Sequence, residues 1–242
     1  MTDVGAPSFE ELIRNGAPPL TIDFTPDRPV LFIAFGGMAA RAGRALFELS
    51  QVSAGLPINR LFLRDVNRLW YHGGLPGLGA NIDGVARSLQ KLVARQEPRR
   101  VVVFGNSGGG YAAMLFGHLL RADEVHAFAP QVFVSPLRRL LLRDVRRLTR
   151  SRMIALFFDC RAQRKYFDLT RVLSAGSGAT THHIHYPTGQ RMDRFHAELL
   201  RGLKVVILHP YPVAHHGLMR TLRDNGRLRR ILLEAMQLPH AA

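Results

Sequence analysis

The 242-residue sequence is poor in cysteine, in acidic side chains and in long apolar runs. Its one cysteine, Cys160, cannot form an internal disulfide. The first residues lack the basic, apolar and small-residue order of a signal peptide, so we expect a cytoplasmic location. The longest apolar stretch, residues 30–40, is broken by Gly36 and Gly37. It is too short to cross a bilayer, so we expect no membrane span.

Arginine supplies most of the charge. The chain has 33 lysines and arginines against 18 acidic residues, a net charge of +15, and only three of the cations are lysines. Seven arginines and one acid lie in residues 138–152, where leucines recur at helical spacing opposite the arginines. This pattern predicts a basic amphipathic helix, a candidate for a small cap. It fits either an ordinary surface helix whose leucines face the core, or a binding surface for an anionic substrate, an acidic partner or a membrane.

Nucleic acid is not among the expected partners. The arginines of residues 138–152 are not interleaved with aromatic side chains, and no known nucleic-acid module surrounds them. The oligomeric state is left open.

Apolar runs alternate with segments of helical periodicity along the whole chain. The runs predict buried strands at residues 30–35, 61–63, 101–104, 125–129, 154–158, 183–186 and 205–208, and the other segments predict helices at 41–49, 83–95, 111–120, 137–148, 166–173 and 192–203. This order predicts one α/β domain over residues 1–242, with a mostly parallel sheet sandwiched by helices. Ligands of such sheets bind at the carboxyl ends of the strands.

One strand-turn-helix pattern carries the strongest chemical signal. The apolar run 101–104 leads through Gly-Asn-Ser-Gly-Gly at residues 105–109 into an alanine-rich helical segment. This G-x-S-x-G pattern is typical of a nucleophile elbow, whose sharp turn exposes the hydroxyl of Ser107 and whose glycines prevent a collision of strand and helix. The alternative is a glycine-rich turn of another α/β fold. No G-K-[ST] follows, which argues against a P-loop.

A serine nucleophile needs a base and an acid that orients the base. The loop after the last apolar run contains His215 and His216. We favour His216 because helix-forming residues follow it, and His215 is the alternative. Asp193 lies between the nucleophile and the base in chain order, as an elbow of this kind requires, and Asp159 and Asp168 are alternatives. Asp193 also fits a plain acidic residue in the first turn of a helix.

Backbone N–H groups near Ser107 are candidates for an oxyanion hole. The N–H of Gly108 follows the nucleophile at a helix N-terminus. Gly37 or Met38, in the loop after the strand 30–35, is expected to supply the second donor. The same glycines also fit a tight strand-to-helix turn.

Histidines gather on the strand predicted near residue 183. His182, His183 and His185 could suggest a metal site, but the sequence around them offers no spaced set of cysteines or carboxylates. We therefore expect neither a metal ion nor a cofactor.

The elbow at residues 105–109, the loop 35–38 and the order of Asp193 and His216 resemble the α/β-hydrolase fold superfamily. The pairs Arg64-Asp65 and Trp70-Tyr71, the glycines Gly74 and Gly77, and the run 127–131 are similar to a group of small bacterial α/β-hydrolase-like proteins linked to surface polysaccharide loci. The resemblance implies hydrolysis of esters or related acyl compounds. It also admits acyltransferases and non-catalytic members.

The leading hypothesis is a serine hydrolase, specifically an esterase with the triad Ser107, His216 and Asp193. Its substrate would be a small-molecule or glycan-linked acyl ester, with an anionic group as one option, and peripheral contact with a membrane is compatible with it. The alternatives are an acyltransferase and a non-enzymatic module that binds a glycan or a partner.

Overall fold

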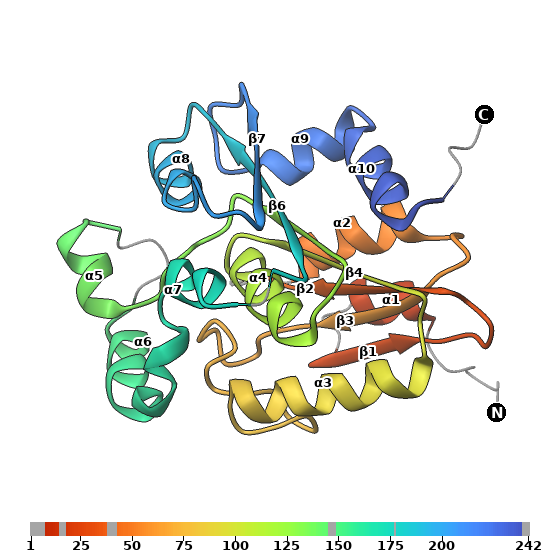
Figure 1. The fold of residues 1–242 in the computed structure, drawn as a ribbon, viewed down its shortest axis with the longest axis horizontal. Coiled ribbons are helices and arrows are strands. Elements are labelled where there is room, and N and C mark those ends of the chain that lie inside the picture. The colour runs from red at the N-terminus through yellow and green to blue at the C-terminus, as the bar shows by residue number, and fades with distance from the viewer. Residues whose placement is uncertain (1–7, 15–17, 38–42, 145–148, 177, 239–242) are drawn as a thin grey trace, which may run out of the picture.

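The computed structural model describes residues 8–14, 18–37, 43–144, 149–176 and 178–238. These residues form a seven-stranded sheet with helices on both faces (Figure 1). The strands are β1 Leu20–Asp23, β2 Val30–Phe35, β3 Asn59–Leu63, β4 Arg100–Asn106, β5 Glu124–Phe128, β6 Thr181–Pro187 and β7 Val206–Tyr211. Their order in the sheet is β1-β3-β2-β4-β5-β6-β7. Only β1 is antiparallel to its neighbour, so the predicted mostly parallel sheet is confirmed.

The helices divide the apolar side chains into two clusters, one on each face of the sheet. The helices are α1 Phe9–Arg14, α2 Gly43–Ser53, α3 Ile82–Gln96, α4 Gly108–Leu120, α5 Pro136–Leu141, α6 Arg150–Ile154, α7 Leu169–Ser174, α8 Arg191–Glu198, α9 Leu218–Asp224 and α10 Arg227–Met236. Successive strand residues point to opposite faces, so Ile33 joins the cluster of α3 and α4 while Phe32 joins that of α2, α9 and α10. Burial on both sides explains the continuous apolar runs. None of the described helices is both long enough and apolar enough to cross a membrane.

The first described residues form regular structure. Ser8 and Glu11 cap α1 reciprocally: the Glu11 N–H donates to Ser8 Oγ at 3.2 Å, and the Ser8 N–H donates to Glu11 Oε2 at 2.8 Å. Beyond α1, residues 20–23 form β1 along the edge of the sheet, a strand that the sequence pattern did not predict.

The strand predicted at residues 154–158 is wrong. Thr149 caps α6, which runs on through a π-helical turn, Ala155–Asp159, to a 3-10 helix, Arg161–Tyr166. The place beside β5 in the sheet is taken by β6, and Phe157 and Phe158 are exposed. A short apolar run has no periodicity of its own and cannot distinguish a strand from a helix.

The amphipathic helix predicted over residues 138–152 is also wrong in its length and in its buried face. Helix α5 ends at Leu141, Arg143 follows with a positive φ of 54°, and α6 begins only at Arg150. The expected core residues Leu140 and Leu141 are 53% and 73% exposed, whereas Arg139 is fully buried. Part of the predicted helix, residues 145–148, lies outside the described residues. The segment does form a helical excursion after β5, at one end of the molecule (Figure 1).

Candidate active site

Ser107 occupies a strained turn between β4 and α4. Its φ of 57° and ψ of −117° are unfavourable for any residue with a side chain, so surrounding contacts must hold it. The Ser107 N–H donates to the Phe128 carbonyl at 2.9 Å, and the Ser107 carbonyl accepts from the N–H groups of Tyr111 and Gln131 at 3.1 and 3.3 Å. The half-buried serine therefore has the backbone geometry of a nucleophile elbow.

Two glycines of the elbow are required by close backbone approaches. A Cβ on Gly105 would lie 2.1 Å from the Gly109 carbonyl oxygen, and a Cβ on Gly109 would lie 2.2 Å from the Phe35 carbonyl oxygen. Strand β4, helix α4 and the loop after β2 thus meet at distances that no side chain permits. This contact explains the G-x-S-x-G pattern.

The loop after β2 lies against the elbow, where the second oxyanion donor is expected. A Cβ on Gly37 would be 3.0 Å from the Asn106 carbonyl oxygen, and Gly108 is the first residue of α4. Met38 lies outside the described residues. The placement of Gly37 and of the Gly108 N–H is compatible with an oxyanion hole, whose donors must surround one point beside the nucleophile.

Tyr71, which the sequence did not assign to the site, holds this loop. Its buried hydroxyl lies 3.0 Å from the carbonyl oxygens of both Gly36 and Leu63, and its N–H donates to Asp65 Oδ2 at 3.0 Å. Burial raises the pKa of Tyr71 well above its usual value, so the hydroxyl keeps its proton as a donor. Burial likewise raises the pKa of Asp65. Tyr71 and the neighbouring Trp70 are fully buried, so both are core residues.

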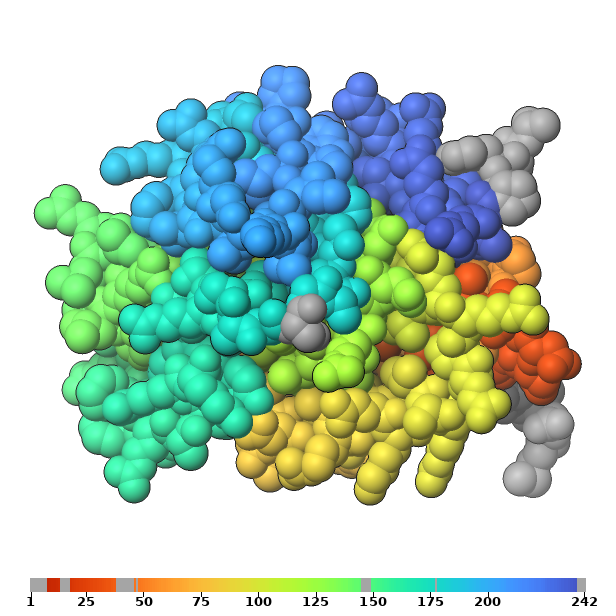
Figure 2. Space-filling model, in the orientation of Figure 1, coloured from red at the N-terminus to blue at the C-terminus, as the bar shows by residue number. Residues whose placement is uncertain are grey.

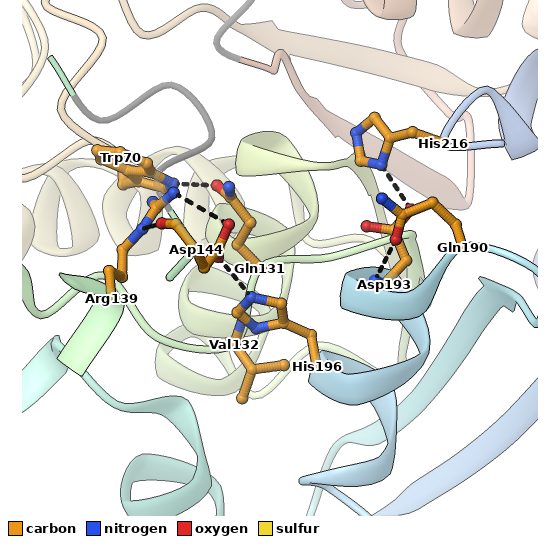
Figure 3. A network of polar contacts seen from close by, with 9 residues as sticks. All are labelled: Trp70, Gln131, Val132, Arg139, Asp144, Gln190, Asp193, His196 and His216. Atoms are coloured by element: carbon orange, nitrogen blue, oxygen red, sulfur yellow. Dashed lines mark hydrogen bonds and ion pairs between the residues drawn. The ribbon is translucent and has the colours of Figure 1, made fainter. Parts of the chain in front are cut away.

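Asp193 and His216 form a direct pair. Asp193 Oδ2 lies 2.7 Å from His216 Nδ1, and the Asp193 carboxyl is fully buried while the imidazole is 42% exposed (Figure 3). Asp193 lies in the first turn of α8, where its N–H donates to Gln190 Oε1 at 2.7 Å. This contact favours the tautomer with the proton on Nδ1, which leaves the lone pair on Nε2.

The acid, the base and the serine leave the sheet at the same edge. Ser107 follows β4, Asp193 follows β6 and His216 follows β7, and these strands are parallel. The loops after β6 and β7 are joined directly, because the Thr188 N–H donates to the Tyr211 carbonyl at 2.8 Å and the Gly189 N–H donates to the Val213 carbonyl at 3.1 Å. These hydrogen bonds hold together the two loops that precede Asp193 and His216, which are 23 residues apart in the sequence and in contact.

The alternative residues have other contacts. His215 is exposed, and its Nδ1 accepts from the Gly217 N–H at 3.1 Å. Asp159 is exposed in the π-helical turn, and Asp168 caps α7 and pairs with Arg138. Of the three acids considered, Asp193 is therefore the one that His216 contacts within the described residues.

A buried polar network lies beside this pair (Figure 3). His196, one turn after Asp193 on α8, places Nε2 2.9 Å from Asp144 Oδ2 and accepts from the Val132 N–H at 3.0 Å. Arg139 donates from Nε to the Asp144 carbonyl at 3.0 Å, and its guanidinium lies 4.9 Å from the centre of the Trp70 ring. The network joins the segment after β5 to the helix that carries Asp193. Sequence periodicity missed it, although Asp144 was the single acid in the basic run.

A second cluster lies where β5 begins, at the opposite edge of the sheet. Carboxylate and imidazole atoms of Glu124, His126 and His183 all lie within 4.8 Å of one another, close enough to suggest a metal site. However, the rings of His126 and His183 are stacked at 4.5 Å and 2°. Imidazole binds metals in its ring plane, so one ring would have to turn before both could face one ion. Burial lowers the pKa of His126 and lowers that of His183 to about 4, so both rings are neutral at pH 7.

The architecture and the elbow define the α/β-hydrolase fold, as the sequence resemblance predicted. No family model matches the chain, and no curated protein matches it in sequence. Solved structures match over most of its length. An alpha/beta hydrolase enzyme from a metagenome of lagoon sediments at Mar Chica, Morocco, covers 90% of this chain and 96% of its own, with a TM-score of 0.57 and 14% identity.

Two further structures extend the comparison. A thermophilic esterase from the Planctomycetes species Thermogutta terrifontis covers 92% of this chain and 91% of its own, with a TM-score of 0.55 and 17% identity. The capsule O-acetyltransferase of Neisseria meningitidis serogroup A covers 90% and 92%, with a TM-score of 0.59 and 13% identity. At these identities the likeness is one of fold.

Proposed function

We propose that the protein is a serine hydrolase that cleaves an acyl ester with Ser107, His216 and Asp193. The observation that carries the proposal is the 2.7 Å contact between a fully buried Asp193 and His216, at the sheet edge where Ser107 occupies a positive-φ elbow. Burying a carboxyl group is costly unless it is paired, and the imidazole provides the pairing. The proposal includes the cytoplasmic location expected from the sequence.

In this mechanism the Ser107 hydroxyl attacks the ester carbonyl carbon while His216 Nε2 takes its proton. The backbone N–H of Gly108, with that of Gly37 or Met38, stabilises the oxyanion. The intermediate collapses, the C–O bond to the leaving alcohol breaks, and the imidazolium returns the proton to that alcohol. Water then attacks the acyl-enzyme with His216 again as base, which releases the acid and restores Ser107. Asp193 stays ionised and holds the ring throughout.

Acyl transfer is the second candidate. It uses the same residues, with an acceptor hydroxyl in place of water in the second half-reaction. The likeness in fold to a capsule O-acetyltransferase supports this second candidate. The same likeness suggests a glycan hydroxyl as the acceptor class. The third candidate, a non-catalytic binding module, predicts that none of these chemical steps occurs.

Turnover of p-nitrophenyl esters tests the proposal. We expect hydrolysis by the wild-type protein and a loss of roughly 10⁴-fold in Ser107→Ala, by the precedent of serine triads. Ser174→Ala, which changes an exposed serine at the end of α7, is the matched control and should keep full activity. Added glycan acceptors distinguish transfer from hydrolysis, since transfer alone yields an acylated glycan. Equal turnover by Ser107→Ala and the wild type would reject the assignment.

A further inference from the structure

Exposed large apolar side chains gather in one part of the described chain, the segment from α5 to the π-helical turn. They are Leu137, Leu140, Leu141, Leu142, Ile154, Phe157 and Phe158, with Leu141 and Phe158 at 73% and 64% exposure. Helices α5 and α6 lie at the same end of the molecule, far from α10 (Figures 1 and 2), and Leu137 of α5 and Phe157 after α6 line one cavity. A patch of this kind on a folded protein marks an interaction surface. We call the described residues of this segment, 136–144 and 149–171, the cap surface.

The cap surface also carries net positive charge. Its described residues contain nine arginines and lysines and three acids, so they carry +6 of the net charge of +15. At least one cation lies directly beside an apolar side chain of this surface: Arg164 lies 5.3 Å from the centre of the Phe157 ring. A cavity of about 490 Å³ opens between α5 and α7, lined by Arg138, Arg164, Lys165 and Arg171 together with Phe157 and Phe167.

The partner must therefore accept apolar side chains and supply negative charge across the same surface. A second copy of this chain does not fit, because two cap surfaces would bring like charges together. An anionic lipid surface offers both: leucine and phenylalanine side chains enter the boundary between headgroups and acyl chains, and arginines bind the lipid phosphates. We propose that the cap surface docks on anionic lipid membranes.

The docked face adjoins the candidate active site. The cap surface begins just after the loop that follows β5, and Arg139 and Asp144 join it to His196 on α8, the helix that carries Asp193. Docking would hold this edge of the sheet near the membrane. The inference does not depend on the proposed chemistry, because lipid binding is measured without substrate.

Co-sedimentation with vesicles tests the proposal. One set of vesicles consists of phosphatidylcholine and the other of phosphatidylcholine mixed with phosphatidylglycerol. We expect the full-length protein to bind the mixed vesicles, to bind neutral vesicles weakly, and to lose the difference at high salt because surface charges are then screened. Ser107→Ala should bind as the wild type does, which separates docking from catalysis.

Two double variants test the two components of the surface. Leu141→Ser with Phe158→Ser removes exposed apolar area, and Arg161→Glu with Arg171→Glu reverses two exposed charges. Each should weaken binding to mixed vesicles by at least roughly tenfold, the first because it removes apolar side chains that enter the acyl boundary and the second because it reverses charges that bind lipid phosphates. Matched controls, Ile22→Ser with Ile207→Ser and Lys91→Glu with Arg95→Glu, change exposed residues elsewhere and should bind normally.

Circular dichroism melting identifies any double variant that fails to fold. The other double variant then tests the proposal. Three results would overturn the proposal. The first is binding to neither vesicle, and the second is equal, salt-independent binding to both. The third is a dimer in light scattering that the Leu141→Ser, Phe158→Ser variant dissociates, which would make the surface an interface between two copies of this chain.

Discussion

The elbow and the cap surface differ in how their sequence relates to their structure. Around Ser107 the residue types answer a local backbone requirement: a Cβ at Gly105 or at Gly109 would lie only 2.1 or 2.2 Å from a backbone oxygen, so only glycine fits. In the cap surface, helical periodicity predicted the reverse of the structure, since Arg139 is buried and Leu141 is exposed. Steric requirements of a turn can be read from a few residues, whereas the buried face of a short helix depends on partners distant in sequence.

The largest effect is expected at Asp193. Asp193→Asn keeps the size of the side chain but removes the charge that holds His216 in its tautomer, so kcat for ester hydrolysis should fall by about 10³- to 10⁴-fold. Asp168→Asn, at the cap of α7, is the control and should stay within a few-fold of the wild type. Comparable losses in both variants would remove the distinction between the two acids.

The buried arginine of the cap surface comes next. Arg139→Leu should destabilise the protein by roughly 3–5 kcal/mol, because it leaves the buried Asp144 without its guanidinium partner. Leu141→Arg, two residues away on the same helix, should change stability by about 0.5 kcal/mol or less, because this side chain is exposed. Chemical denaturation measures both. A larger loss of stability in Leu141→Arg than in Arg139→Leu would mean that the leucine face is buried, as the sequence predicts.

Much of the fold and part of the site were predictable from the sequence. The strands β2, β4 and β6 follow from runs buried on both faces, and Asp193 and His216 were predicted as a pair and lie in contact. The pattern missed β1, an edge strand with half-exposed residues, and mistook residues 154–158 for a strand because a short apolar run has no period. Tyr71 and His196 could not be found, since their roles depend on contacts between distant segments.

Packing at the elbow gives a smaller effect. Gly109→Ala should cost roughly 1–3 kcal/mol or more, because the new Cβ would lie 2.2 Å from the Phe35 carbonyl oxygen. Gly77→Ala is the comparison: the Gly77 Cβ position has nothing within 4 Å, and its cost should be only the roughly 1 kcal/mol of a positive φ. Thermal melting of both variants tests whether the close approach, and not the loss of a glycine, is responsible.

The smallest effect concerns acid stability. Burial lowers the pKa of His182 from 6.5 to about 3 and that of His183 to about 4, whereas residues 136–171 contain no histidine. Between these folded-state pKa values and 6.5, the histidines bind protons in the unfolded chain but not in the folded protein. The free energy of unfolding should therefore fall as the pH drops below 6.5. His182→Phe should reduce the slope of melting temperature against pH, and Leu141→Ser should leave it unchanged. An unaltered slope in His182→Phe would place the titrating group elsewhere.

Labelling by a fluorophosphonate, with peptide mapping of the adduct, shows directly which serine is the nucleophile. The reagent modifies a serine only where a base activates it. We predict a single adduct on Ser107, absent from Ser107→Ala and formed far more slowly in Asp193→Asn. An adduct on another serine, or labelling of Ser107 at the same rate in Asp193→Asn, would contradict the account.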